Sequence, residues 1–338
     1  MISVILPLPA PEPETVRGLS SSFVTVEKGL WAGLVLDALV GDPRRGHPVA
    51  GFGRAASMLE GRLYRDSVAR GAVFTAACVL GAAGAGVVVD AVGRRTAASV
   101  VLTGAATWAV LGGTSLGREG LAMAAALEAG DVEAARRRLP HLCGRDPSEL
   151  DAKELARATV ESIAENTSDA AVAPLFWGAV LGVPGLLAYR AVNTLDAMVG
   201  HRSPRYLRFG RVAARLDDAA NWTPARLTGL LTVACAPLVG GSPRASYAIL
   251  RRDGAAHPSP NAGRCEAAFA GALGVRLGGV NVYGNRVEHR PELGDGRAAE
   301  PADIRRAVRL SRAVTVASAA VTIGARAAVR AWSRSRRR

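Results

Sequence analysis

The chain has 338 residues, of which 49% are hydrophobic, 5% aromatic and 21% charged. Its mean hydropathy is +0.16, and this aliphatic weight excludes a disordered chain, a collagen and a disulfide scaffold. The net charge of +13 comes from 42 basic and 29 acidic residues. Because the arginines are spread over all polar segments and are not interleaved with aromatic side chains, we expect no nucleic-acid partner. Membrane lipid and phosphorylated substrates are the expected partners.

The first segment, residues 1–28, is rich in proline and lacks the basic start of a signal peptide, so we expect a flexible leader. The apolar run 29–40 follows, and we expect Asp37 to break this helix before it could span a membrane. The motif GDPRRGHPVAGFGR at 41–54 comes next and begins with a turn signal.

Five long stretches of the chain contain no charged residue; they are 71–89, 96–117, 170–189, 227–243 and 313–325. A spanning helix needs about 20 apolar residues, and the short link 90–95 makes the first two stretches a helical hairpin. The sequence therefore predicts an all-α, polytopic integral membrane protein of the cell membrane, with about four or five transmembrane helices and polar helical loops. We expect residues 29–325 to form one membrane-embedded domain, the catalytic domain if the chain is an enzyme, and residues 326–338 to form a basic tail.

The third stretch contains Val183-Pro184-Gly185, which favours a broken or re-entrant helix. If the chain turns back there, every arginine-rich segment lies on one side of the membrane, as the positive-inside rule requires. A single crossing would instead place the basic segment 190–226 on the other side. The sequence alone leaves both topologies open.

An acidic stripe precedes this third stretch. Glu161, Glu165 and Asp169 are spaced i, i+4, i+8 and share one helical face. Asn166 lies beside them at the membrane boundary. Carboxylates and amides there are candidate ligands for a hard cation, most plausibly Mg²⁺. The alternative is a solvated helix face with ordinary surface ion pairs.

A second polar run follows the third stretch, where Asn193 and Asp196 share a helical face at i, i+3. The two halves of 170–196 would meet if the helix breaks, so we expect the acidic stripe, Asn193 and Asp196 to line one cleft. His201, Arg202 and Arg205 flank a Ser-Pro turn, an arrangement that suits phosphate binding. The alternative is a basic loop on the membrane surface.

Three further segments add candidate substrate-binding residues. Asp42, His47 and Arg54 lie in the 41–54 motif, and Asn221 precedes the fourth apolar stretch. The segment SPNAGRCEAAFAG, with Asn261 and Arg264, resembles an anion-binding helix start, although an ordinary capped helix is the alternative. The four cysteines form no CxxC pair, and no P-loop motif is present.

Taken in order, these motifs resemble the CobD/CbiB family of cobalamin biosynthesis, adenosylcobinamide-phosphate synthase, over about residues 29–325. The resemblance implies an ATP-dependent carbon–nitrogen ligase. Such an enzyme joins an amino alcohol phosphate, aminopropanol phosphate, to the free propionate carboxyl of adenosylcobyric acid. ATP and Mg²⁺ are the implied cofactors, and the corrinoid, the amino alcohol phosphate and membrane lipid are the implied partners, with other cobalamin pathway enzymes as further candidates.

The candidate residues then divide by role. The catalytic candidates are Glu161, Glu165, Asn166 and Asp169. The metal-ligand candidates are Glu161, Glu165, Asp169 and Asp196. The substrate-binding candidates are Asp42, His47, Arg54, Asn193, His201, Arg202, Arg205, Asn221, Asn261 and Arg264. The main alternative function is a membrane carrier for a phosphorylated metabolite, which would carry its polar residues at mid-depth and show an internal repeat. A non-catalytic scaffold for other pathway enzymes is a third possibility.

Overall fold

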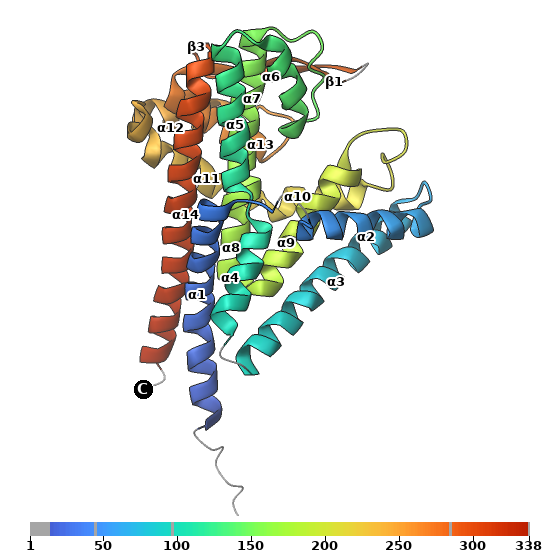
Figure 1. Cartoon of the computed structure of the whole chain (residues 1–338), viewed down its shortest axis with the longest axis vertical. Helices are drawn as coiled ribbons and strands as arrows, with labels where there is room; N and C mark the ends of the chain where they lie inside the picture. Colours follow the sequence, from blue (N-terminus) through green and yellow to red (C-terminus); the bar gives the residue numbers. More distant parts are fainter. Residues whose placement is uncertain (1–13, 44–45, 96–97, 284–285, 337–338) are drawn as a thin grey trace, which may run out of the picture.

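The computed structural model describes residues 14–43, 46–95, 98–283 and 286–336, and most of them are helical (Figure 1). The α-helices are α1 (Glu14–Val40), α2 (Pro48–Leu63), α3 (Val68–Arg95), α4 (Ser99–Val110), α5 (Gly113–Glu128), α6 (Val132–Arg138), α7 (Ala152–Thr167), α8 (Ala173–Leu181), α9 (Val183–Leu195), α10 (Arg211–Ala220), α11 (Trp222–Cys235), α12 (Pro243–Asp253), α13 (Ala262–Leu273) and α14 (Pro301–Ser335). The short helical turns are η1 (Leu139–His141), η2 (Ser168–Val172), η3 (Asp196–Gly200) and η4 (Ala236–Val239).

Among the described residues, three segments are long and apolar enough to cross a membrane: Val68–Gly93, Ser99–Glu128 and Pro301–Ser335. They confirm the predicted helical, polytopic membrane protein. The predicted stretches 170–189 and 227–243 are instead divided into shorter elements. Figure 1 shows α6, α7 and α13 together at one end of the molecule, with α3 and α4 toward the other end.

The N-terminal helix corrects the expectation that Asp37 breaks it. Helix α1 continues through Asp37 to Val40, and the buried Asp37 carboxylate caps a neighbouring helix instead. Its Oδ2 accepts hydrogen bonds of 3.1 Å from both the backbone nitrogen and the hydroxyl of Thr114, in the first turn of α5. This cap lies just after Leu111 and Gly112, where the predicted stretch 96–117 divides into α4 and α5.

Parts of the predicted terminal segments lie outside the described residues, namely 1–13 of the leader and 337–338 of the tail. Helix α1 already begins at Glu14, inside the segment assigned to the leader. Helix α14 continues to Ser335, well into the segment assigned to the basic tail.

The third apolar stretch turns back on itself, as the Pro-Gly pair suggested. Helix α8 ends at Gly182, whose φ of 72° is costly for residues with a side chain. Helix α9 then begins at once and packs against α8. Gly185 permits this close approach, because a Cβ there would lie 2.4 Å from the carbonyl oxygen of Trp177. The two ends of 170–196 are therefore brought together.

A small sheet in the polar segment 244–312 departs from the all-helical expectation. Strands β1 (Val275–Tyr283) and β2 (Arg286–Leu293) form an antiparallel hairpin, and β3 (Arg297–Ala298) pairs with β1 in parallel. A register shift between Leu277 and Gly279 bends β1. Gly278 at this bulge has a φ of 85°, and a Cβ there would lie 2.1 Å from the carbonyl oxygen of Pro291.

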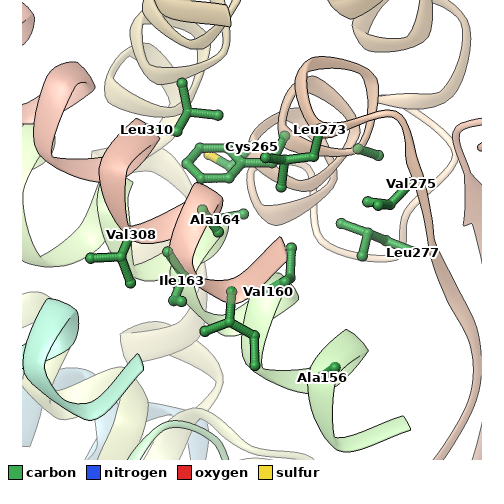
Figure 2. Packing of buried hydrophobic residues seen from close by; sticks show 14 of the residues in the cluster. Ala156, Val160, Ile163, Ala164, Cys265, Leu273, Val275, Leu277, Val308 and Leu310 are labelled. Atoms are coloured by element: carbon green, nitrogen blue, oxygen red, sulfur yellow. The ribbon is translucent and has the colours of Figure 1, made fainter. Parts of the chain in front are cut away.

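The largest hydrophobic core joins α7, α13, α14 and β1 (Figure 2). Ile163 of α7 and Leu310 of α14 are fully buried in it. Figure 2 shows Leu310 close to Cys265 of α13 and Ile163 close to Val308 of α14. Leu277 of β1 extends this core into the hairpin. The buried apolar contacts of this core fix the position of α7. Helix α7 and the turn η2 that follows it carry the acidic stripe.

A test of this packing uses Gly71, where α3 touches the loop before α10. A Cβ at Gly71 would lie 1.8 Å from the carbonyl oxygen of Phe209, a fully buried residue. We expect Gly71→Ala to lower the free energy of unfolding by about 1–3 kcal/mol or more, since backbone must move. Gly81→Ala on the same helix meets nothing within 4 Å and is the control. Thermal melting in detergent measures both, and equal melting temperatures would contradict the close contact.

Candidate functional site

A cavity of about 290 Å³ lies where α7, α9, α13 and the β-hairpin meet. The residues that line it are Leu142, Cys143, Gly144, Arg145, Ala158, Glu161, Ser162, Glu165, Asn166, Asp169, Asn193, Asp196, Ala197, Glu266 and Arg290. Most of these side chains are polar or charged. The cavity therefore suits a charged ligand better than an apolar one.

The cavity confirms the predicted cleft. The acidic stripe Glu161, Glu165 and Asp169 lines it together with Asn193 and Asp196 from the other side of the helix break. The two halves are directly linked, because Asn193 Nδ2 donates to Asp169 Oδ2 at 3.3 Å. Asn166 also lines the cavity, and its side-chain amide donates to the Ser162 carbonyl at 2.9 Å.

Two π-helical turns position the aspartates of the cleft. Asp169 lies in η2, which continues α7, and Asp196 begins η3, which continues α9. A π-turn inserts an extra residue into a helix and redirects the side chains on it, and such turns are frequent at functional sites.

A smaller cavity of about 30 Å³ adjoins the first and shares Glu165 and Asp169 with it. Asp217, Asn221 and Asn261 also line this smaller cavity. Asn221 is buried and donates to Asp217 Oδ2 at 3.0 Å, while its own oxygen accepts from the Tyr189 hydroxyl at 2.8 Å. Asn261 donates to the Asp218 carbonyl at 2.8 Å. The predicted Asn221 and Asn261 thus lie in the wall between α10 and α13.

Glu161 differs from the other members of the stripe because its carboxylate is fully engaged. It forms a buried ion pair with Arg145 at 2.6 Å and a second pair with Arg157 at 3.3 Å. It also accepts a 2.7 Å hydrogen bond from the backbone nitrogen of Gly278. Arg157 in turn donates to the carbonyls of Gly278 and Val280. Glu161 therefore anchors the β-hairpin to α7.

The remaining carboxylates of the cleft repel one another. Water reaches the Glu165 side chain through the cavity, yet enclosure by the protein raises its pKa, and the negative charges of Asp196 and Glu161 add to the effect. Burial also raises the pKa of Asp169 well above its ordinary value, with further contributions from Asp217 and Glu165. A bound cation would relieve this repulsion.

The donor set of the cleft fits Mg²⁺ in part. Within the described ranges, no group of three or more His, Cys, Asp or Glu side chains stands close enough together to hold a metal ion. However, Mg²⁺ is commonly held by only one or two carboxylates, with substrate phosphates and water completing its shell. Glu165, Asp169 and Asp196 face the cavity and can serve in this way, whereas the oxygens of Glu161 are already occupied.

The predicted basic loop lies beside the cleft and not in its wall. Arg205 pairs with Glu60 of α2 at 2.9 Å and stacks 4.0 Å above the Tyr64 ring, so α2 already holds this guanidinium. His201 and Arg202 are exposed. His201 is close enough to act on Asp196 of the cavity wall, and Arg202 acts on Asp218, which lines neither cavity.

The residues of the 41–54 motif and Arg264 also lie outside the cavity walls. His47 caps α2 by accepting a 3.1 Å hydrogen bond from the Val49 nitrogen, and its other ring nitrogen lies 3.9 Å from Asp42. The charge of Asp42 acts on Arg190, and the charge of Arg190 acts on Asp169 in the cleft. The 41–54 motif is therefore linked to the cleft through Arg190. Arg54 is exposed and Arg264 half-buried.

Sequence reasoning missed five residues of the site. Tyr189 holds Asn221, and Arg145 and Arg290 bring positive charge to the cavity. Glu266 lies in the cavity wall, and His257 lies 3.8 Å from it. His257 and Glu266 both belong to the segment HPSPNAGRCE. They are nine residues apart, a spacing that does not indicate a shared face of one helix or strand.

The stability of the cleft should depend on pH through Asp217. Burial, together with the charge of Asp196, raises the pKa of Asp217 to about 7 from 3.8, against the hydrogen bonds from Asn221 and Asn193. The folded chain keeps this proton between those pH values while the unfolded chain loses it. The contribution of Asp217 to the free energy of unfolding is therefore fully present below about pH 4 and is lost as the pH rises through 7.

We expect the melting temperature to fall between pH 5.5 and 8.5, and to fall less for Asp217→Asn, whose amide oxygen can still accept from Asn221. Thermal melting in a series of buffers measures this difference. Identical pH profiles for the two proteins would show that Asp217 carries no raised pKa.

The chain is similar to known cobalamin proteins over most of its length. The family model described as CobD/Cbib protein matches residues 30–311. A protein of Mycobacterium tuberculosis (strain CDC 1551 / Oshkosh), named Cobalamin biosynthesis protein CobD, is 54% identical over 313 residues, covering 90% of this chain and 97% of that protein. Proteins with the same name from Pelobacter propionicus and Rhodobacter capsulatus are 41% and 43% identical, covering 88% and 80% of this chain and 94% and 86% of theirs. No solved structure gives a significant match.

Proposed function

The chain belongs to the CobD/CbiB family and acts in cobalamin biosynthesis; from this premise we propose that it is an ATP-dependent ligase. In the proposed reaction, the free propionate carboxyl of adenosylcobyric acid is joined to aminopropanol phosphate, and the product is adenosylcobinamide phosphate. A carboxylate does not react with an amine unaided. The proposal therefore includes activation of the carboxyl by phosphoryl transfer from ATP.

The cavity is the observation that carries this proposal. Three carboxylates with free space before them, Glu165, Asp169 and Asp196, face one volume of about 290 Å³ that Arg145 and Arg290 also line. The carboxylates repel one another unless a cation lies between them, and the neighbouring arginines attract anions. Together they suit a phosphate group with a bound metal ion. A purely structural cluster would instead pair its charges, as Glu161 does with Arg145 at 2.6 Å.

One or two of the carboxylates of Glu165, Asp169 and Asp196 would hold Mg²⁺ on the nucleotide. When bound, the ion would neutralise phosphate charge and polarise the transferred phosphoryl group. Asn193 would orient Asp169 through the 3.3 Å hydrogen bond between them. Arg145 and Arg290 bring positive charge to the cavity wall that would attract phosphate oxygens, while Arg145 keeps its ion pair with Glu161.

Alignment of the two substrates would supply much of the rate. Holding an amine against an activated carboxyl corresponds to effective molarities of about 10⁵–10⁸ M in well-oriented cases. The cavity is too small for a whole corrinoid, and we propose that only the propionate arm, the amino alcohol and the phosphates enter it. The corrin macrocycle would then remain outside the cavity, against the part of the protein formed by the candidate membrane-spanning segments.

An assay with the purified full-length chain in detergent tests the function. Adenosylcobyrate, aminopropanol phosphate, ATP and Mg²⁺ are combined, and amide product and ADP are measured together. We expect one ADP for each amide formed and no amide when ATP or Mg²⁺ is omitted. Vesicles that take up a phosphorylated metabolite without forming any amide would favour the membrane carrier instead.

A further inference from the structure

Glu266 of the cavity wall forms a buried pair with His257, which lies behind it, and the roles above use neither residue. The His257 side chain is 3% exposed and that of Glu266 is 1% exposed, and His257 Nε2 lies 3.8 Å from Glu266 Oε1. This distance is too long for a hydrogen bond. Two ionisable groups are therefore held together in the interior without satisfying each other.

The local backbone fixes how His257 presents its ring. The backbone nitrogen of Ser259 donates to His257 Nδ1 at 3.0 Å, which is shorter than the 3.4 Å between Nδ1 and the Ser259 carbonyl oxygen. The shorter bond assigns Nδ1 as the acceptor and leaves the hydrogen of the neutral ring on Nε2. Gly263 lies against the ring, since a Cβ there would come 2.3 Å from His257 Cβ. The Nε2–H group therefore faces Glu266 in a fixed orientation.

Both groups have an unsatisfied atom in the interior. Across the part of the chain that the structure describes, neither His257 Nε2 nor Glu266 Oε2 has a hydrogen-bond partner. A buried polar atom left unpaired costs about 1–3 kcal/mol, and such an atom in a cavity wall marks a place where a ligand can supply the missing partner. Glu266 lines the large cavity, so that ligand would reach it from the cleft.

The charged groups around Glu266 are of both signs. Glu161 and Glu165 contribute negative charge at Glu266, while Arg290 and Arg145 contribute positive charge. Burial raises the pKa of Glu266 well above its ordinary value, and burial lowers the pKa of His257. A raised pKa makes a carboxylate a stronger base, which brings it closer to the basicity of an amine.

From these observations we propose that Glu266 binds the ammonium group of the amino alcohol phosphate and accepts its proton, with His257 as the residue that positions the carboxylate. The inference rests on the proposed ligase function and names the group that generates the nucleophile. Glu266 is the catalytic residue in this scheme, and His257 acts through it.

The proposed step balances as follows. The ammonium nitrogen gives one proton to Glu266 and becomes a neutral amine with a free electron pair. That pair forms the carbon–nitrogen bond at the activated carboxyl carbon, and the bond from that carbon to the phosphate oxygen breaks. The electron pair of the broken bond leaves with the phosphate, which takes the second nitrogen proton.

Hydroxylamine separates this step from carboxyl activation, because hydroxylamine is uncharged at neutral pH and needs no base. The purified full-length chain is supplied with adenosylcobyrate, ATP and Mg²⁺, and with either aminopropanol phosphate or hydroxylamine. For Glu266→Gln we expect amide formation to fall by about 10²- to 10⁴-fold, while ATP-dependent hydroxamate formation stays within about threefold of the wild-type rate. Glu292→Gln is the matched control, because Glu292 is an exposed glutamate of strand β2 outside the cavity, and it should change neither rate.

The His257 variant tests positioning. Asparagine can still accept the hydrogen bond from Ser259 but lacks an atom in place of Nε2. We expect His257→Asn to lower kcat for the amide about tenfold and to leave the hydroxamate rate and the melting temperature unchanged. A structural role would lower all three.

The outcomes are distinct. Equal loss of amide and hydroxamate in Glu266→Gln, or an unchanged amide rate, would overturn the role of Glu266. A wild-type chain that forms neither product would overturn the ligase function itself, and the role of Glu266 in it.

Discussion

Glu165→Gln should lower Mg²⁺-dependent amide formation by roughly 10²- to 10⁴-fold, because a metal ligand supplies several kcal/mol of charge stabilisation and each 1.36 kcal/mol is a factor of ten in rate. Glu165 lines both cavities and makes none of the ion pairs that occupy Glu161. Glutamine keeps the shape of the side chain and removes its charge. The loss should therefore be in chemistry and not in folding.

The measurement is the rate of amide formation as a function of Mg²⁺ concentration, with the melting temperature as a second readout. Glu165→Gln should require more Mg²⁺ for half-maximal rate and melt no lower than the wild type, since it removes a carboxylate with a raised pKa. If Glu165→Gln formed amide at the wild-type rate at limiting Mg²⁺, the acidic stripe would be an ordinary solvated helix face and not a metal site.

Glu161→Gln should give the opposite pattern. It leaves Arg145, which is 4% exposed at its side chain, without the carboxylate that neutralises it, and it weakens the contact to Gly278. Breaking a buried ion pair by removing one partner costs about 3–5 kcal/mol. We expect the melting temperature to fall by roughly 5–10 °C, with the β-hairpin released from α7.

The two glutamine variants control for each other, because they lie one helical turn apart on the same face of α7. Proteolysis of the hairpin segment, compared between them in detergent, adds a local readout. If Glu161→Gln melted at the wild-type temperature while losing activity, Glu161 would be a ligand and not an anchor.

The sequence predicted the features that follow from simple periodicity and composition. Charge-free stretches gave the membrane architecture, and the Pro184-Gly185 pair gave the turn between α8 and α9. The i, i+4, i+8 spacing placed Glu161, Glu165 and Asp169 on one face. Each of these inferences depends on a local rule of helix geometry or of membrane solvation.

The remaining features depend on contacts between distant segments. Of the partners of Glu161, only Arg157 is near it in the sequence, whereas Arg145 comes from the loop before α7 and Gly278 from β1. The sequence near Glu161 therefore indicated a surface ion pair and not an anchor. The π-turns at Asp169 and Asp196 are one-residue insertions that helical periodicity does not reveal. Asp37 resembled a helix breaker because its partner, Thr114, is 77 residues away.

The most direct test of the ligase function follows an oxygen atom. Adenosylcobyrate is labelled with ¹⁸O in its free carboxyl and is converted with aminopropanol phosphate, ATP and Mg²⁺ by the full-length chain. If the carboxyl is activated by phosphoryl transfer, one labelled oxygen appears in the released inorganic phosphate for each amide formed. Unlabelled phosphate, or amide formed without any consumption of ATP, would contradict the account.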